Sequence, residues 1–184
     1  MDINQQGAVL TNGWNGGYQD SMLWNGGQGQ VLKALSPHFD DTDPNSPIVP
    51  TTEAWAMNDL NQAVDASGTA GHEVHAVLWQ HSQVVDLHSG IGQGSIARDI
   101  NNAGQIVVNS TLADNTTRVG MWRNGSLINL GPAAGPAEGL AINAGGAVVG
   151  WSALANGKHH AALWNDGLAL DLNTLIFSTK GAFT

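Results

Sequence analysis

Two aspartates in this sequence occupy the same position beside an asparagine. Asp2 lies two residues before Asn4, and Asp99 lies two residues before Asn101. On a β-strand this spacing places the two side chains on one face, because successive side chains alternate between faces. Carboxylate and amide oxygens are the ligands that Ca²⁺ prefers, so these four residues are candidate calcium ligands. In the alternative interpretation, the aspartates merely lie at solvated strand ends.

Two histidines also recur in matching surroundings. His75 and His160 each begin a segment of the form His-Ala-x-Leu-Trp. An imidazole titrates near neutral pH, which makes both histidines candidate general bases. Glu53 and Glu138 each precede an asparagine by five residues and are the accompanying acidic candidates. The alternative is a scaffold role, in which each histidine hydrogen-bonds a neighbouring strand.

A third candidate lies in an acidic, proline-rich stretch. Asp41, Asp43 and Asn45 have the alternate-residue spacing of oxygen ligands in a curved calcium-binding loop. The match is partial, because Ser46 and Thr52 stand where such loops carry glycine and glutamate. A solvated loop that covers one end of the molecule is the alternative.

Other kinds of chemistry have less support. The sequence contains no cysteine, which excludes disulfides and thiolate metal sites. It also lacks a Gly-x-Ser-x-Gly elbow, a phosphate-binding loop and a dinucleotide fingerprint. A covalent serine mechanism therefore has no support.

These candidates belong to a fourfold internal repeat with two anchors. The first anchor is a hydrophobic residue followed by asparagine, at Ile3-Asn4, Met57-Asn58, Ile100-Asn101 and Ile142-Asn143. The second is a hydrophobic residue followed by tryptophan, at Leu23-Trp24, Leu78-Trp79, Met121-Trp122 and Leu163-Trp164. A period in the low forties is typical of propeller blades and of some helical arrays. We assign the units to about 1–53, 54–96, 97–138 and 139–184, within one domain.

Local signals favour strands over helices in each unit. Turns with asparagine first and glycine fourth follow the first anchor, although the second copy has Asn61, which tolerates a left-handed φ, in place of glycine. Hairpin signals follow the tryptophans at Asn124-Gly125 and Asp166-Gly167, with Asn25-Gly26 similar. No window shows a sustained helical period. The sequence predicts an all-β fold, a small β-propeller of four-stranded antiparallel blades, with four or five blades and one anchor tryptophan filling each interface between blades.

The copies alternate in their polar residues. Asp2 and Asp99 occur in the first and third copies, whereas the second and fourth have Ala56 and Ala141 at that position. In a closed ring of four blades, alternate copies face each other across the axis. We therefore expect the two aspartates to lie on one diameter, and the histidines and glutamates on the other. Closure by the tail near 177–184 against the first strand is one possibility, and a larger ring made by two chains is another.

The residues around these anchors carry a family resemblance. The segment Ile142–Leu172 resembles the bacterial extracellular HAF repeat, with the pattern Ile-Asn-x-x-Gly-x-Val-Val-Gly-Trp-Ser and a later His-Ala-x-x-Trp. The first and third copies depart from it, with Asp20-Ser21 and Arg118-Val119 in place of His-Ala. The resemblance implies an extracellular or periplasmic location, although this chain shows no signal peptide. It implies no single activity.

Composition restricts the choice of partners. The formal net charge of −9, with only six lysines and arginines, argues against nucleic-acid binding. No apolar run is long enough for a membrane span. The function we predict is a Ca²⁺-dependent hydrolase of a small lactone or ester, acyl-homoserine-lactone type by analogy with propeller lactonases. The alternative is a non-catalytic, secreted-type binding and scaffold propeller for a ligand, glycan or protein. A small-molecule ligand or substrate and a homodimer through strand edges or termini are the expected partners.

Overall fold

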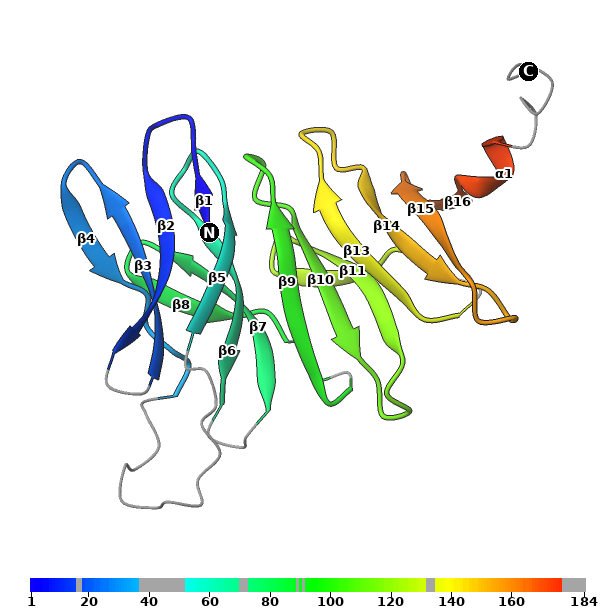
Figure 1. Cartoon of the computed structure of the whole chain (residues 1–184), viewed down its shortest axis with the longest axis horizontal. Coiled ribbons are helices and arrows are strands. Elements are labelled where there is room, and N and C mark those ends of the chain that lie inside the picture. The colour runs from blue at the N-terminus through cyan, green and yellow to red at the C-terminus, as the bar shows by residue number, and fades with distance from the viewer. Residues whose placement is uncertain are drawn as a thin grey trace.

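The computed structural model describes residues 1–15, 18–36, 52–69, 73–88, 90, 92–131 and 135–176. Within them the chain forms four antiparallel sheets of four strands, each with its strands in sequence order (Figure 1). The first sheet contains β1 (Asp2–Ile3), β2 (Val9–Asn15), β3 (Tyr18–Asn25) and β4 (Gln28–Val31). The second contains β5 (Thr52–Met57), β6 (Ala63–Gly68), β7 (Val74–Gln80) and β8 (Gln83–Asp86).

The third and fourth sheets repeat this plan. The third contains β9 (Gly94–Ile100), β10 (Ile106–Thr111), β11 (Thr117–Arg123) and β12 (Ser126–Asn129). The fourth contains β13 (Ala137–Ile142), β14 (Val148–Ala153), β15 (His159–Asn165) and β16 (Leu168–Asp171), and the short helix α1 (Asn173–Ile176) follows it. The predicted fold class is confirmed: all-β, with one four-stranded antiparallel sheet for each sequence repeat. No helix among the described residues has the length and hydropathy of a membrane span.

Turn chemistry explains why each unit folds in this way. Asn124-Gly125 and Asp166-Gly167 join the last two strands of their sheets, and all four residues have positive φ. This is the two-residue hairpin that the dipeptides predict. In the turn after the first anchor, Asn61 has a φ of 59°, where the other copies have glycine at positive φ. The asparagine takes the left-handed conformation that the sequence predicts for it.

The sheets stack in series, and a hydrophobic core fills each contact between consecutive sheets. Each sheet has a leading face toward the preceding sheet and a trailing face toward the next one. In the second sheet, Ala63 and Val77 on the leading face pack with Leu10 and Leu23 of the first sheet. Val64 and Leu78 on the trailing face pack with the third sheet. A third core joins the third and fourth sheets.

The burial of each anchor tryptophan depends on the position of its sheet in the stack. Trp79 and Trp164 are buried in the cores on the leading faces of their sheets. Trp122 packs at the edge of the middle core, on the leading face of the third sheet. Trp24, on the leading face of the first sheet, has no preceding sheet among the described residues and is 43% exposed.

The described sheets form an open row, with the first and fourth sheets at its two ends (Figure 1). The expected closure of four blades into one ring is therefore not seen in this part of the chain. The tail at 177–184, which we expected to close a ring, lies outside the described residues. In an open row, sheets one and three are second neighbours instead of opposite blades.

Candidate functional site

The turn-end groove is a shallow depression of about 340 Å³ at the end of the stack where the anchor turns lie. All four sheets contribute to it through the last residues of their first strands and the turns that follow. Its lining mixes amide, carboxylate and apolar side chains, from Asp2, Ile3, Asn4, Gln5, Met57, Asn58, Asp59, Ile100, Asn101, Asn102, Ile142 and Ala144. Its lining includes three of the four residues predicted from the aspartate and asparagine pattern, Asp2, Asn4 and Asn101, but not Asp99.

The anchor asparagines link the sheets in a directional chain. The side-chain amide of Asn4 donates to the backbone carbonyl of Asn58 at 3.1 Å. In the same way Asn58 donates to the carbonyl of Asn101 at 3.1 Å, and Asn101 donates to that of Asn143 at 2.9 Å. Each link joins one sheet to the next, so the asparagines hold the turn ends together.

The oxygen of each anchor side chain is also engaged. It accepts the backbone N–H groups two and four residues further along its own turn. Asn4 and Asn101, the two predicted amide ligands, therefore use both ends of their side chains in the scaffold. A metal ion at these oxygens would compete with two amide donors at each site.

Asp2 and Asp99 make equivalent contacts to the next sheet. One oxygen of Asp2 accepts the N–H of Ile3, and the other accepts the N–H of Met57 in the second sheet at 3.0 Å. Asp99 accepts the N–H of Ile100 and that of Ile142 in the fourth sheet, both at 2.8 Å. All four carboxylate oxygens therefore accept a backbone donor.

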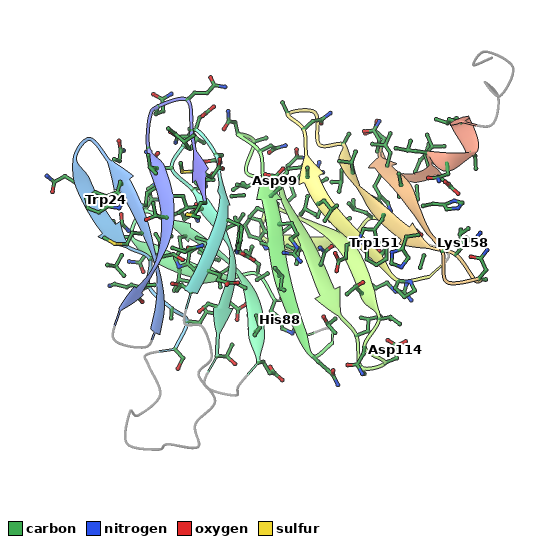
Figure 2. The ribbon with its side chains drawn as sticks, viewed as in Figure 1. Trp24, His88, Asp99, Asp114, Trp151 and Lys158 are labelled. Atoms are coloured by element: carbon green, nitrogen blue, oxygen red, sulfur yellow. The ribbon has the colours of Figure 1, made fainter. Side chains whose placement is uncertain are left out.

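The two aspartates also influence each other. Burial raises the pKa of the Asp99 carboxyl, the N–H groups of Ile142 and Ile100 oppose that rise, and the negative charge of Asp2 adds to it. The two carboxylates are thus close enough to repel, although they belong to different sheets. Figure 2 shows Asp99 at the turn end of the stack and His88 farther down, toward the opposite end of the strands.

A second pair of polar residues joins the same sheets, and the sequence analysis did not identify it. Asn109 in β10 donates to the carbonyl of Gly139 at 3.0 Å and accepts its N–H at 2.9 Å. Asn12 in β2 makes the same two contacts with Ala54, at 3.1 and 3.2 Å. Each follows its anchor asparagine by eight residues, and only in copies one and three. This shared position in the repeat could have identified the pair from the sequence.

The predicted histidines are each paired with an aspartate of the adjacent outermost strand. His75 Nδ1 lies 2.8 Å from a carboxylate oxygen of Asp86, and His160 Nδ1 lies 2.7 Å from one of Asp171. The hydrogen bond to His160 lowers the pKa of the Asp171 carboxyl. Such His–Asp pairs orient an imidazole, and they serve equally well in a scaffold and in a general base.

Further contacts surround His75. Its Nε2 atom lies 3.3 Å from a carboxylate oxygen of Glu73, and its ring stacks on His88 with 4.1 Å between centroids. His88 Nδ1 in turn lies 3.0 Å from the hydroxyl of Ser95, which is buried. Burial, followed by the neighbouring His75, lowers the pKa of His88. Both ring nitrogens of His75 thus face carboxylates.

The structure does not bring the histidines to the turn-end groove. His75 and His160 lie near the starts of β7 and β15, at the opposite end of the strands from the anchor turns. Glu53 and Glu138 lie at that same far end, near the starts of β5 and β13. Glu53 is four residues from Met57, the partner of Asp2, which is about 13 Å along an extended strand. The candidate base and the candidate metal ligands therefore lie apart.

The remaining candidates can be placed only in part. Asp41, Asp43 and Asn45 lie outside the described residues. Among the residues that are described, no three histidines, aspartates or glutamates form a group that could hold a metal ion. Of the predicted carboxylate ligands, Asp2 lines the groove and Asp99 directly precedes the lining residue Ile100.

Comparison with known proteins supports the fold alone. No protein-family model and no curated protein matches the chain. The chain is similar to the solved structure of TolB from Acinetobacter baumannii, with a TM-score of 0.64 and 11% identity over 92% of this chain and 42% of that one. It is also similar to the β-propeller domain of the Trilobed protease from Pyrococcus furiosus, with a TM-score of 0.59 and 10% identity over 90% of this chain and 50% of that one. A third similar structure is an acylaminoacyl peptidase from Pyrococcus horikoshii, with a TM-score of 0.56 and 14% identity over 96% of this chain and 27% of that one. The chain thus spans half or less of each of these chains, and its four sheets have the arrangement of consecutive propeller blades.

Proposed function

We propose that the chain is a non-catalytic binding and scaffold module of the propeller type, and that its turn-end groove holds a small ligand. The observation that carries this proposal is the groove itself, which all four sheets line with side chains already held by hydrogen bonds. A site that is ordered before binding loses little side-chain entropy when a ligand enters. The separation of the histidines from the groove favours binding over catalysis there.

The groove also indicates the class of ligand. Its acidic members are Asp2 and Asp59, and none of the described residues that line it is a lysine or an arginine. The main-chain and side-chain oxygens accept hydrogen bonds, while Ile3, Met57 and Ile142 supply apolar surface. A small ligand with several hydroxyl or ammonium donors and an apolar face fits this lining, and an anionic ligand does not.

The test is a thermal-shift panel of neutral oligosaccharides and small organic amines. Ala144 is exposed in the groove, so Ala144→Trp should fill it and abolish the shift caused by any ligand that binds there. Ala155, exposed in a turn at the opposite end of the same sheet, gives the control Ala155→Trp, which should leave the shift unchanged. Equal loss in both variants, or none in either, would contradict a ligand site in the groove.

A Ca²⁺-dependent hydrolase of a small lactone or ester is the second candidate. It rests on the two carboxylates Asp2 and Asp99 at the turn end of the stack, oxygen ligands of the kind that Ca²⁺ takes, and on the His–Asp pairs. Turnover of a lactone and ester panel, measured with calcium and with a chelator, decides between the two functions. Chelator-sensitive turnover that Asp2→Asn with Asp99→Asn abolishes would establish the hydrolase. Turnover at the buffer rate under every condition supports the binding module.

The location of the protein in the cell is a separate proposal. The resemblance of Ile142–Leu172 to the bacterial extracellular HAF repeat supports an extracellular or periplasmic location. Fractionation of cells that produce the native gene product, followed by immunodetection of this segment, would locate the protein.

A further inference from the structure

The trailing face of the fourth sheet repeats much of the trailing face of the second. Strand register aligns the two faces position by position, since both sheets share one pattern of pairing. In the second sheet the face includes Ala56, Val64, Ala66, Ala76, Leu78, Val85 and Leu87. In the fourth the matching residues are Ala141, Val149, Trp151, Ala161, Leu163, Leu170 and Leu172. Five of these seven residue types are identical, one exchanges valine for leucine, and Trp151 replaces an alanine.

The two faces differ in what covers them. On the second sheet the face belongs to the core shared with the third sheet, where Val64 is fully buried and Leu78 is 2% exposed. On the fourth sheet Val149 is 43% and Leu170 is 42% exposed. The same apolar surface is thus an interface in one place and open in the other.

The leading face of the first sheet is the complementary half. The second sheet packs on Ile100, Ile106 and Trp122 of the third sheet. Ile3, Val9 and Trp24 occupy those positions on the first sheet, whereas Thr11 and Gly29 stand where the third sheet has Val108 and Leu127. Ile3 is 67% exposed, and Trp24 is exposed as described above. The two ends of the row therefore carry the two halves of an interface that the chain already forms internally.

The asparagine chain has the same direction. Asn58 of the second sheet donates to the carbonyl of Asn101 in the third. Asn143 of the fourth sheet has no following sheet among the described residues, and its side chain is exposed. At the other end of the row, the carbonyl of Asn4 accepts the N–H of Gly7 within its own turn, and no preceding sheet reaches it in the described part of the chain. One end offers the donor and the other the acceptor.

We propose that two copies of this chain join head to tail, with the fourth sheet of each packed on the first sheet of the other, to close a ring of eight sheets. The occupant is a second copy because both complementary faces lie on the same chain, and the new contact repeats the one between the second and third sheets. Such a contact uses different faces on the two partners, and it forms a closed assembly when the rotation between copies returns to its start. Two equivalent contacts then hold the ring.

The negative net charge of the chain opposes this association. Each chain carries a formal net charge of −9, so two copies repel each other in dilute buffer. Added salt screens the repulsion and leaves the apolar contact in place. Dimerisation should therefore strengthen as salt rises from about 0.05 to 0.5 M.

The experiment is the mass of the 184-residue chain in solution, by sedimentation and light scattering across a concentration series. The expected result is a species of twice 19.1 kDa that dissociates on dilution. Val149→Glu and Trp24→Glu should each weaken it by on the order of tenfold or more, because each places a charge in a buried apolar contact. Leu60→Glu is the control, since Leu60 is exposed in a turn outside both end faces and its replacement should leave the mass unchanged.

Mixing the variants tests the head-to-tail geometry. Val149→Glu retains an intact first sheet and Trp24→Glu an intact fourth sheet, so the mixture should form a two-chain species that neither variant forms alone. Circular dichroism checks the fold of each variant, and Leu170→Glu replaces Val149→Glu if the latter does not fold. A wild-type chain that stays monomeric at every concentration and salt level, larger open assemblies, or a mixture without the two-chain species would each overturn the proposal.

Discussion

The contact between the third and fourth sheets is held by polar groups at positions where the contact between the second and third sheets has alanine. Across the former, Asp99 accepts the N–H of Ile142, and Asn109 binds both backbone groups of Gly139. At the same two positions the second sheet has Ala56 and Ala66. Its contact with the third sheet combines the apolar core around Val64 and Leu78 with other hydrogen bonds, such as the one from the N–H of Ala76 to the hydroxyl of Ser95.

The contact between the first and second sheets resembles the polar one. Asp2 accepts the N–H of Met57, and Asn12 binds both backbone groups of Ala54. The sheets therefore form two polar-linked pairs, one and two, three and four, each joined by an aspartate and an asparagine that the contact between the second and third sheets lacks. The alternation of copies in the sequence describes this pairing. The fourth sheet also lacks the aspartate and the asparagine, with Ala141 and Trp151 at those positions.

The largest expected effect comes from removing one of the polar links. Asn109→Ala leaves the buried N–H and carbonyl of Gly139 without their partner, which should lower the free energy of unfolding by about 2–4 kcal/mol. Chemical denaturation of the variant and the wild type measures the difference. Asn12→Ala should cost a similar amount if the two polar contacts are equivalent.

The matched control for that prediction is Asn129→Ala. Asn129 is exposed at the end of β12 and caps only the N–H of Gly131, so its loss should cost less than about 1 kcal/mol. If Asn109→Ala proved no more costly than Asn129→Ala, the distinction between polar and apolar contacts would have no energetic basis.

A second prediction concerns the buried carboxyl of Asp65. It shares a cross-strand row with Ala54 and Val77, which pack against the first sheet, so it belongs to a polar-linked pair. Burial raises the pKa of Asp65 to about 8, although Arg98 opposes the rise, and the charge of Glu53 adds to it. A carboxyl whose pKa is raised in the folded state contributes stability that is complete below its unfolded pKa and is lost as pH rises through the folded value.

The pH window for Asp65 therefore runs from about 4 to about 8, and stability should fall as pH increases through it. Asp65→Asn keeps the shape of the side chain and removes its ionisation, so it should raise the free energy of unfolding by a few kcal/mol at pH 9 and by much less at pH 5. Thermal melts of both proteins from pH 5 to pH 9 test this. Parallel profiles for the two proteins would show that Asp65 does not ionise within that range.

These contacts separate the features that the sequence could predict from those that it could not. The repeat, its hairpins and the left-handed Asn61 follow from local chemistry, because a turn restricts its own residues whatever surrounds it. The alternation of Asp2 and Asp99 was also visible in the sequence. The hydrogen bonds that these two aspartates make could not be predicted. The partner of each is a backbone N–H of the next sheet, and every residue except proline carries that group.

The open row could not be predicted for a related reason. The number of sheets that closes a ring depends on the angle between neighbours, and that angle is set by side-chain packing across each contact. Trp24 and Trp79 occupy the same anchor position after a leucine, yet one is exposed and the other buried. Which of them lies at the end of the stack is a property of the assembly and not of the repeat.

The smallest predicted effect compares two anchor asparagines with the same local role. Asn58 and Asn143 each cap their own turn through the side-chain oxygen, but only Asn58 also donates to a carbonyl of the following sheet. Asn58→Ala should therefore cost about 1 kcal/mol more than Asn143→Ala, the value of one interior hydrogen bond. Denaturation measured at low protein concentration, where any dimer has dissociated, isolates this difference. If the difference then vanished on raising the concentration, Asn143 would have gained the same link from a second copy, and the chain of asparagines would continue from one molecule into the next.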